Sequence, residues 1–345
     1  MTELKRLAVD TSKHVFTLHG VDAADRPVLR RELRRAPFEA FLARLAPTEV
    51  VLEACGGSHH WARRALALGH RVRLIPPQYV KPFVKRGKND RIDAAAIAEA
   101  ASRPGMASVP VKSAEAQAQG MLLKTRALLV KQRTQLANAL RGHAAEFGLV
   151  AAQGMAKVAR LLAAVATDPG VPPLVKATLA RLGQQIAQAD GEVEALDAEL
   201  LALHKAHPLS RLLEGVPGSG PITAISLTLA IDPARFASGR HLAAYLGLTP
   251  RQHSTGGKAR LGRISKAGNT RLRTLLVVGA SAVIRHARPG AKLATPWLLG
   301  LLARKPKKLA AVALANKMAR VVWAMMTRGE AYRPPAATGA LPAAA

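Results

Sequence analysis

The sequence predicts an α/β protein in which a mixed-sheet domain precedes a long helical region and a mainly α-helical C-terminal part. Three observations predict this class. Residues 1–112 alternate between strand-like and helix-like segments, residues 113–207 contain no strand-like segment, and helical stretches after residue 207 are separated by glycine-rich turns. The length of 345 residues suits two or three domains.

The first domain begins with three strand-like segments, and helices and strands then alternate. The three strands are expected at residues 4–10, 15–21 and 27–33, helices at 37–45 and 58–68, and further strands at 49–54 and 71–75. Three antiparallel strands followed by helix–strand–helix–strand predict a mixed sheet of the ribonuclease H type. No GxGxxG motif follows the first strand, which argues against a doubly wound dinucleotide-binding fold.

Residues 113–207 are expected to form two long helices joined by a linker at residues 167–173. Apolar residues in the second helix step by three and four along the sequence, the repeat that favours a left-handed coiled coil. They are Leu179, Leu182, Ile186, Ala189, Val193, Leu196, Leu200 and Leu203. In the first helix, from residue 114 to about 147, Leu122, Leu129 and Leu136 recur every seven residues. The pattern allows the helices to pair within one chain or with a second protomer.

The C-terminal part starts near residue 208 with a pattern typical of a helix–hairpin–helix turn. In GVPGSGPITA, Gly218 and Gly220 would let the backbone and the next helix N-terminus approach a phosphate. An ordinary glycine-rich helix connection is the alternative. Further helices are expected at residues 241–246, 269–286 and 307–326, and the tail at 333–345 is expected to be disordered.

The net charge of +29 indicates a polyanionic partner. Twenty Lys and Arg residues follow residue 232, with Glu330 as the single acid, which favours DNA or RNA over small acidic substrates. An anionic membrane surface is the rival partner, but no run of about 18 uninterrupted apolar residues and no secretory leader is present. Cys55 is the only cysteine, so intrachain disulfides and a cysteine zinc cluster are excluded. These features predict a cytoplasmic protein.

Four acids stand where a metal site could form. Asp10 and Glu53 end two predicted strands, and Asp90 and Asp93 lie three residues apart at the start of a helix expected at residues 89–101. Mg²⁺ prefers oxygen ligands, and metal-bound carboxylates suit phosphoryl transfer. Alternatively Asp90 caps the helix, Asp93 pairs with Arg91 or Arg86, and Asp10 belongs to a turn. Glu53 is the hardest to explain in this way, because a carboxylate that ends an apolar strand is costly unless it is paired or metal-bound.

Several segments in order resemble the DEDD insertion-sequence transposases, the group that includes the Piv and MooV recombinases. They are AVDTSK, LEACGG, KNDRIDA, GVPGSGPITA and PRQHSTGGKARLGRISKAGN. The resemblance implies a RuvC-like domain at residues 1–112 with Asp10, Glu53, Asp90 and Asp93 as Mg²⁺ or Mn²⁺ ligands. It also implies a coiled-coil segment at 113–207 and, at 208–332, a transposase domain with a nucleophilic serine. It further implies guidance by a structured RNA from the element.

The resemblance makes Ser254 the candidate nucleophile, since a hydroxyl in a basic, glycine-rich loop can attack a phosphodiester. On the residues alone, a turn serine in a flexible, phosphate-binding loop is the favoured alternative. Many relatives have serine immediately before the glycine, where this chain has Thr255, so Thr255 is the alternative. His253 could act as a base or contact a phosphate. The candidate nucleic-acid contacts around the serine are Arg251, Lys258, Arg260, Arg263, Lys266, Arg271 and Arg273. Because aromatic residues make up only 3% of the chain, phosphate contacts rather than base stacking are expected to dominate recognition.

The leading hypothesis is therefore a transposase that cuts and rejoins donor and target DNA and acts as a homodimer or homotetramer. One alternative is a metal-dependent nuclease of the Holliday-junction type that hydrolyses DNA without a covalent intermediate. The other alternative is a nucleic-acid-binding protein without enzymatic activity.

Overall fold

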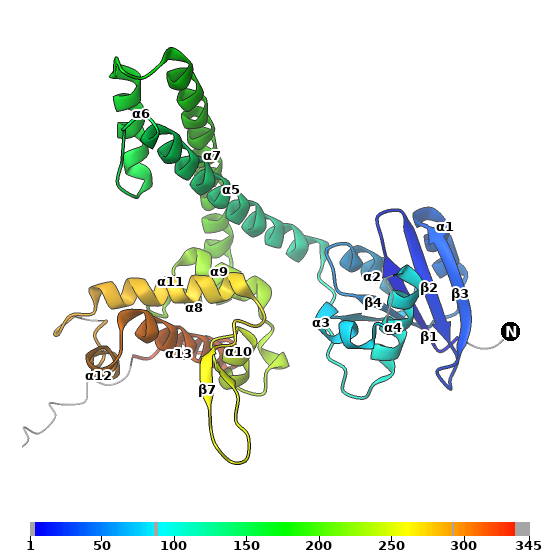
Figure 1. The fold of residues 1–345 in the computed structure, drawn as a ribbon. Helices are drawn as coiled ribbons and strands as arrows, with labels where there is room; N and C mark the ends of the chain where they lie inside the picture. Colours follow the sequence, from blue (N-terminus) through cyan, green and yellow to red (C-terminus); the bar gives the residue numbers. More distant parts are fainter. Residues whose placement is uncertain (1–3, 86–88, 292, 335–345) are drawn as a thin grey trace, which may run out of the picture. The chain divides into compact units, whose positions relative to one another are not determined.

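The computed structural model describes residues 4–85, 89–291 and 293–334. The chain forms two compact units that divide after Ala118 (Figure 1). The tail predicted to be disordered lies outside the described residues from residue 335 onward.

The N-terminal unit is built on a five-stranded mixed sheet with strand order β3-β2-β1-β4-β5. The strands are β1 (Arg6–Thr11), β2 (Val15–Val21), β3 (Pro27–Arg34), β4 (Glu49–Glu53) and β5 (Arg71–Ile75). Strands β1, β2 and β3 pair antiparallel, and β4 and β5 continue the sheet parallel to β1. The predicted mixed α/β sheet is confirmed, because apolar alternation and close hairpin spacing dominate this stretch.

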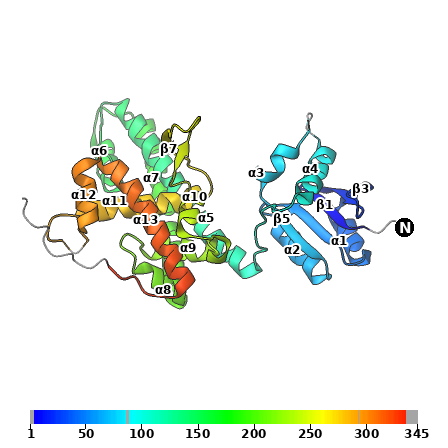
Figure 2. The same ribbon diagram turned by 90° about the horizontal axis from the view of Figure 1, so that it is seen from below.

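Helices cover both faces of this sheet (Figure 2). On one face, α1 (Arg35–Arg44) and α2 (Ser58–Ala67) pack Phe38 and Trp61 against Phe16 in a cluster of edge-on aromatic rings. On the other face, α3 (Pro77–Val80) and α4 (Asp90–Ser102) cover Ala8 and Val51. Because α4 crosses β1 and β2, the first turn of this helix lies at the end of β1.

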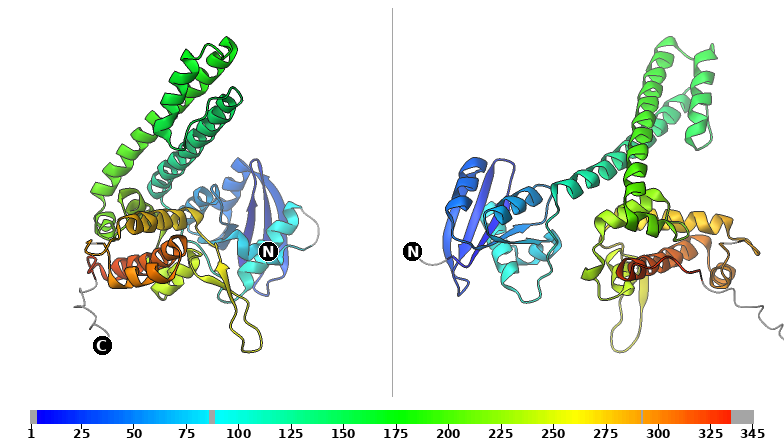
Figure 3. Two further views of the ribbon diagram at one scale, coloured as in Figure 1. Left: turned by 60° about the vertical axis from the view of Figure 1, so that its left-hand side comes forward. Right: turned by 180° about the vertical axis from the view of Figure 1, so that it is seen from behind.

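An antiparallel pair of long helices, α5 (Ala114–Ala145) and α7 (Pro173–Ala206), leads to the C-terminal helices (Figure 3). Two ion pairs, Arg126–Asp197 and Arg133–Asp190, join α5 and α7. A helix that was not predicted, α6 (Val158–Thr167), packs on α5 and α7 and adds residues to one apolar core. Much of the apolar stripe of α7 is thus buried within one chain.

The rest of the second unit is a bundle around a single apolar core. Its elements are α8 (Pro208–Glu214), α9 (Pro221–Ala230), α10 (Gly239–Tyr245), α11 (Thr270–His286), α12 (Pro296–Arg304) and α13 (Lys307–Arg328), with the strands β6 (Pro250–Gln252) and β7 (Leu261–Ile264) between α10 and α11. Helix α12 and the two strands were not predicted. The glycine-rich turn predicted at GVPGSGPITA joins two helices, α8 and α9.

Helix α13 is long and apolar enough to cross a membrane by length and composition, the one such helix among the described residues. In this fold, however, one side of α13 belongs to the bundle core. The buried residues on that side are Ala310, Ala311, Ala315, Met318, Ala319, Val322 and Met325. The composition of α13 therefore matches that of a core helix.

Candidate functional site

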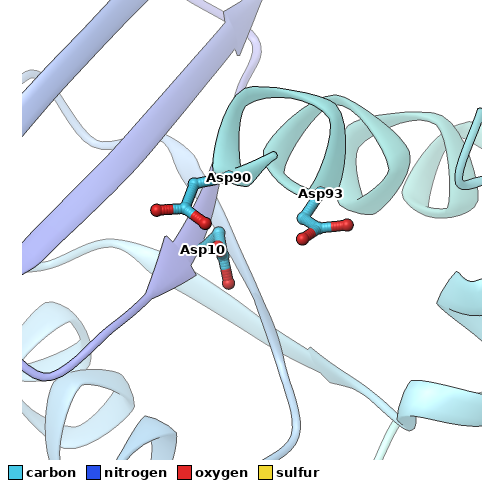
Figure 4. Close-up of side chains that lie close together, drawn as sticks. All are labelled: Asp10, Asp90 and Asp93. Atoms are coloured by element: carbon cyan, nitrogen blue, oxygen red, sulfur yellow. The ribbon is translucent and has the colours of Figure 1, made fainter. Parts of the chain in front are cut away.

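Three carboxylates meet at the end of β1 (Figure 4). Each of Asp10, Asp90 and Asp93 offers one oxygen, and these oxygens all lie within 4.8 Å of one another. Asp10 lies near the end of β1, whereas the other two project from the first turn of α4. Residues three apart in a helix share a face, so both aspartates can point at the strand. The i, i+3 spacing thus produces the cluster that the sequence predicted.

The structure shows neither a capping role for Asp90 nor an ion pair of Asp93 with Arg91, while the other predicted partner, Arg86, lies outside the described residues. Asn89, not Asp90, caps α4, because its side-chain oxygen accepts a hydrogen bond from the backbone N–H of Ile92 at 2.9 Å. Arg91 pairs with Glu32 of β3 at 2.9 Å. Asp93 therefore gains no ion pair with Arg91 and remains beside Asp10.

Glu53 lies at the end of β4, the parallel neighbour of β1. Burial raises the pKa of Glu53, and the charge of Asp93 raises it further. Glu53 is not part of the group within 4.8 Å, but it interacts electrostatically with both Asp93 and Asp10. The predicted fourth acid thus borders the cluster from the next strand.

Burial and the neighbouring acids raise the pKa of Asp10 and of Glu53. Burial, the largest cause, and then the charges of Asp93, Asp90 and Glu53 together raise the pKa of Asp10 from 3.8 to about 6. A hydrogen bond from the backbone of Thr11 opposes the shift only in part. A divalent cation would offset this repulsion, and carboxylate oxygens are the ligands that Mg²⁺ and Mn²⁺ prefer. The donor set therefore fits a divalent metal.

A groove of about 540 Å³ lies beside the cluster, between β2, β3 and α4. Thr17 lines the groove and pairs directly with Asp10 across the β1–β2 ladder. The groove also contains Arg30, Arg31 and His19, and burial together with Arg30 lowers the pKa of His19. These groove residues were missed at the level of the sequence. The pattern in β3, where Leu29 and Leu33 flank charged residues, could have indicated that charged side chains line one surface of this strand.

Ser254 lies in a β-hairpin rather than in the loop expected between helices. Strands β6 and β7 pair antiparallel, and the turn between Thr255 and Lys258 contains Gly256 at φ +53° and Gly257 at φ +75°. Two successive residues with positive φ are the requirement of a type I′ hairpin turn, which glycine meets without strain. The two glycines beside the serine thus close the hairpin.

The hydroxyl of Ser254 is held in place by the hairpin backbone. Its Oγ accepts hydrogen bonds from the backbone N–H of Arg260 and from the side-chain amide of Gln252, both at 3.1 Å. A Cβ added at Gly262 would come within 3.4 Å of the His253 ring, so that ring lies over the opposite strand. Successive side chains of an extended strand point to opposite faces. His253 is therefore poorly placed to take a proton from Ser254.

The basic residues predicted around the serine fall into two groups. Arg251, Lys258, Arg260, Arg263 and Lys266 are all exposed, and the first four lie on the hairpin itself. Arg273, by contrast, is only 8% exposed, and its guanidinium donates to the carbonyls of Leu246 and Ala267 at 3.0 and 2.7 Å. Arg273 therefore holds the loop before α11 from the inside. Arg271 is half-buried, and burial together with Arg126 lowers its pKa.

The predicted phosphate-binding glycines also differ from each other. Gly218 has φ +86°, and a Cβ there would lie 2.7 Å from the carbonyl oxygen of Gly279 in α11. Gly218 thus permits a close backbone crossing. Gly220 is the residue that precedes α9, and it has open space around it. The acids belong to the first unit and Ser254 to the second, so the structure shows two separate groups of candidate residues.

Known proteins match most of the chain. A family model described as the "Transposase IS116/IS110/IS902 family" matches residues 210–294, and a model of DEDD type described as "Transposase" matches residues 7–147. A "Putative transposase y4pF/y4sB" of Sinorhizobium fredii is 50% identical over 96% of this chain and 86% of its own length. A "Probable family 20 transposase" of Pseudomonas aeruginosa is 47% identical over 96% and 99% of the two chains. The "Transposase for insertion sequence element IS1111A" of Coxiella burnetii is 42% identical over 96% and 92%.

Proposed function

The chain belongs to the IS116/IS110/IS902 family of transposases, and from this we propose that it cuts and rejoins DNA by phosphoryl transfer with Asp10, Glu53, Asp90, Asp93 and Ser254. The observation that carries the proposal is the convergence of three aspartates at the end of β1 with Glu53 on the neighbouring strand. The half-buried Asp10, whose pKa is raised by burial and by the neighbouring acids, is costly for folding and so supports a site kept for chemistry.

We infer a RuvC-like domain at residues 1–112. The strand order, with three antiparallel strands and two parallel additions, supports this inference, as do the acids at the ends of β1 and β4. Residues 113–207 would form the coiled-coil segment and residues 208–332 the transposase domain. The antiparallel α5–α7 pair and the bundle core support these bounds.

A divalent cation, Mg²⁺ or Mn²⁺, would be held by Asp10, Asp90 and Asp93, with Glu53 beside them. Bound there, it would neutralise the charge that develops on a phosphate during the reaction. The protein's part is to orient the carboxylates, through the cap at Asn89 and the end of β1. The basic groove that begins at Thr17 supports a DNA strand passing next to this cluster, because Arg30 and Arg31 can neutralise its phosphates.

Ser254 would act as the nucleophile. Its oxygen would form a bond to the phosphorus as the bond to one sugar oxygen breaks. The proton that the Ser254 hydroxyl loses would pass, directly or through solvent, to that sugar oxygen. The phosphoserine link keeps the energy of the broken bond, so rejoining needs no ATP. The exposed cations of the hairpin support this role, because they can neutralise the phosphate that is attacked. The Ser254 oxygen accepts two hydrogen bonds, from Arg260 and Gln252, and one of them would break as that oxygen attacks. Thr255 instead forms the bridge that closes the turn with Lys258.

Phosphate contacts from the exposed hairpin cations would hold donor and target DNA. Guidance by a structured RNA rests on the resemblance described above, and the strong positive charge of the chain suits that partner. We further propose a cytoplasmic homodimer or homotetramer, since two DNA partners must be cut and joined together.

The test is recombination of a marked donor with a target, in the presence of Mg²⁺ and with or without RNA from the element's flank. Asp10→Ala and Asp93→Ala should each abolish strand cleavage and leave DNA binding nearly intact, because exposed cations elsewhere supply the affinity. A covalent protein–DNA adduct should form in the wild type. Hydrolysis without an adduct would instead indicate a nuclease, and retained cleavage in both variants would indicate that the acids have no catalytic role.

A further inference from the structure

A second groove, of about 930 Å³, lies in the C-terminal unit where the hairpin joins the bundle. Pro250 and Ile264, which pair at the base of the hairpin, both line it. Its other walls come from α10, α12 and α13, with Trp297 and the cations Arg240, Lys317 and Arg320. No residue lining this groove is acidic.

Helix α13 has two faces, and the second one forms the groove wall. Its core face is buried in the bundle, whereas Val312, Asn316 and Arg320 recur every four residues on the groove side, with Leu309 and Lys317 beside them. Leu309 is 52% exposed, and Val312 and Asn316 are half-buried. The groove thus combines apolar surface with positive charge along one helix.

Trp297 differs from the other two tryptophans of the chain. Trp61 is 4% exposed in the core of the first unit. Trp323 also lines the groove, but it is half-buried, and its indole N–H donates to the carbonyls of Pro233 and Phe236 at 3.2 and 3.1 Å. Trp297 is 41% exposed, and the Lys317 ammonium lies 4.2 Å from the centroid of its ring. A large aromatic surface and a cation therefore meet at the groove wall.

The combination selects a ligand with both a flat ring and negative charge. A base in an intact duplex is stacked on its neighbours and cannot offer a face to an indole, whereas an unpaired base can. Arg240, Lys317 and Arg320 can neutralise the phosphates on either side of such a base. A nucleotide in a single strand meets each of these requirements.

We propose that this groove binds an unpaired nucleotide of the DNA strand, with the base against Trp297 and the flanking phosphates near Arg240 and Arg320. The choice of DNA rests on the proposed function, because the groove adjoins the hairpin of Ser254. Pro250 precedes Ser254 by four residues, which span at most about 13 Å of extended chain. The bound nucleotide therefore lies a few positions from the phosphate that Ser254 reaches. Stacking thus contributes at this one place in a chain poor in aromatics.

The test measures binding of a fluorescent single-stranded DNA, its RNA counterpart and a DNA duplex, without divalent metal so that no chemistry occurs. Trp297→Ala should weaken single-stranded DNA binding about 5- to 100-fold, the effect of losing one stacked base, and change duplex binding less than about twofold. Trp297→Phe should retain most of the affinity, because a ring remains. Tyr245→Ala is the matched control, since Tyr245 is a similarly exposed aromatic of the same unit outside the groove.

A second variant separates stacking from charge. Arg320→Gln should lower the salt dependence of binding by about one phosphate contact, whereas Trp297→Ala should leave that slope unchanged. Photocrosslinking of the wild-type protein to single-stranded DNA that carries 5-iododeoxyuridine should label Trp297, which requires no folded variant. The proposal would be overturned if Trp297→Ala bound single-stranded DNA with wild-type affinity, or lost equal affinity for single strand and duplex. A larger loss of affinity for RNA than for single-stranded DNA in this variant would also overturn it. Because cleavage is not measured, the result does not depend on the roles of Asp10 and Ser254.

Discussion

Asp10 shows how a single residue can mark a site. Its carboxyl group holds a proton to about pH 6, because burial and the neighbouring acids disfavour the charged form. The unfolded chain releases that proton near pH 3.8. Between these values the folded protein binds more protons than the unfolded chain, so raising the pH lowers the free energy of unfolding. Above pH 6 the full loss in the free energy of unfolding is present unless a bound cation offsets the charge of Asp10.

The melting temperature should therefore depend on metal and pH together. Because protons compete with a cation for Asp10, addition of Mg²⁺ should raise the melting temperature of the first unit at pH 7.5 and have little effect near pH 5. Asp10→Asn should remove most of this response and raise the melting temperature of the metal-free protein at pH 7.5. Thermal scans with MgCl₂ or CaCl₂ against a matched NaCl control measure both effects. Equal shifts at the two pH values would argue against a metal site at Asp10.

The two neighbouring hydroxyls of the hairpin make different predictions. Ser254→Ala should eliminate the covalent DNA adduct and recombination, while the fold and RNA binding persist, because only the attacking oxygen is lost. Thr255→Ala should reduce activity less, since the Thr255 backbone pairs with Lys258 whatever the side chain. Peptide mapping of a trapped adduct identifies the attachment site. Attachment at Thr255 would reverse the assignment.

Acids at strand ends and at a helix start are visible in sequence and pointed to the four acids, whereas the choice of Ser254 came from the family resemblance. The sequence did not predict that Arg273 is buried, since an arginine that donates to two loop carbonyls looks the same as one that faces solvent. Nor did it show that Gly218 meets Gly279, which depends on a contact between residues far apart in the chain. The sequence around Trp297 did not predict that this residue lines a groove, because the groove forms only when α12 and α13 pack together.

At the scale of elements, the five strands and most long helices follow from apolar periodicity. The first sheet was predictable because its strands alternate or form buried runs and end at turns. The hairpin β6–β7 was not, since its residues are charged and mostly exposed and its strands are short. Helix α6 was missed although apolar residues line one of its faces, because the two long helices beside it dominated the pattern.

Two helical glycines should respond in opposite ways to alanine substitution, because only Gly279 lies where the α8–α9 turn crosses α11. A Cβ at Gly279 would lie 2.0 Å from the carbonyl oxygen of Gly218, so Gly279→Ala forces backbone apart and should cost about 1–3 kcal/mol or more. Gly142 in α5 has open space, so Gly142→Ala should stabilise by about 0.5–1 kcal/mol. Melting of the second unit, followed by calorimetry, measures both changes. A neutral Gly279→Ala would show that α11 can shift away from the turn.

At the scale of the whole molecule, the four acids belong to one compact unit and Ser254 to the other. A joint reaction needs residues from both, within one chain or between chains. Sequence patterns do not encode that arrangement, because an apolar stripe such as that of α7 fits a partner helix from either source. Much of the apolar stripe of α7 is buried within one chain. Contacts between protomers through the long helices would therefore need apolar residues that remain exposed on α5 or α7.

The last prediction concerns assembly through those residues. Met121 and Leu128 are 62% and 53% exposed, and they lie seven residues apart on one side of α5. If the long helices join two protomers, Met121→Glu with Leu128→Glu should lower the mass measured by light scattering and leave the melting temperature nearly unchanged, because neither side chain is in a core. Val193 is 5% exposed, so Val193→Lys should instead lower the melting temperature whatever the assembly. Val278→Glu in α11, at a residue 60% exposed, controls for added charge. An unchanged mass in the α5 double variant would place any interface elsewhere on the chain.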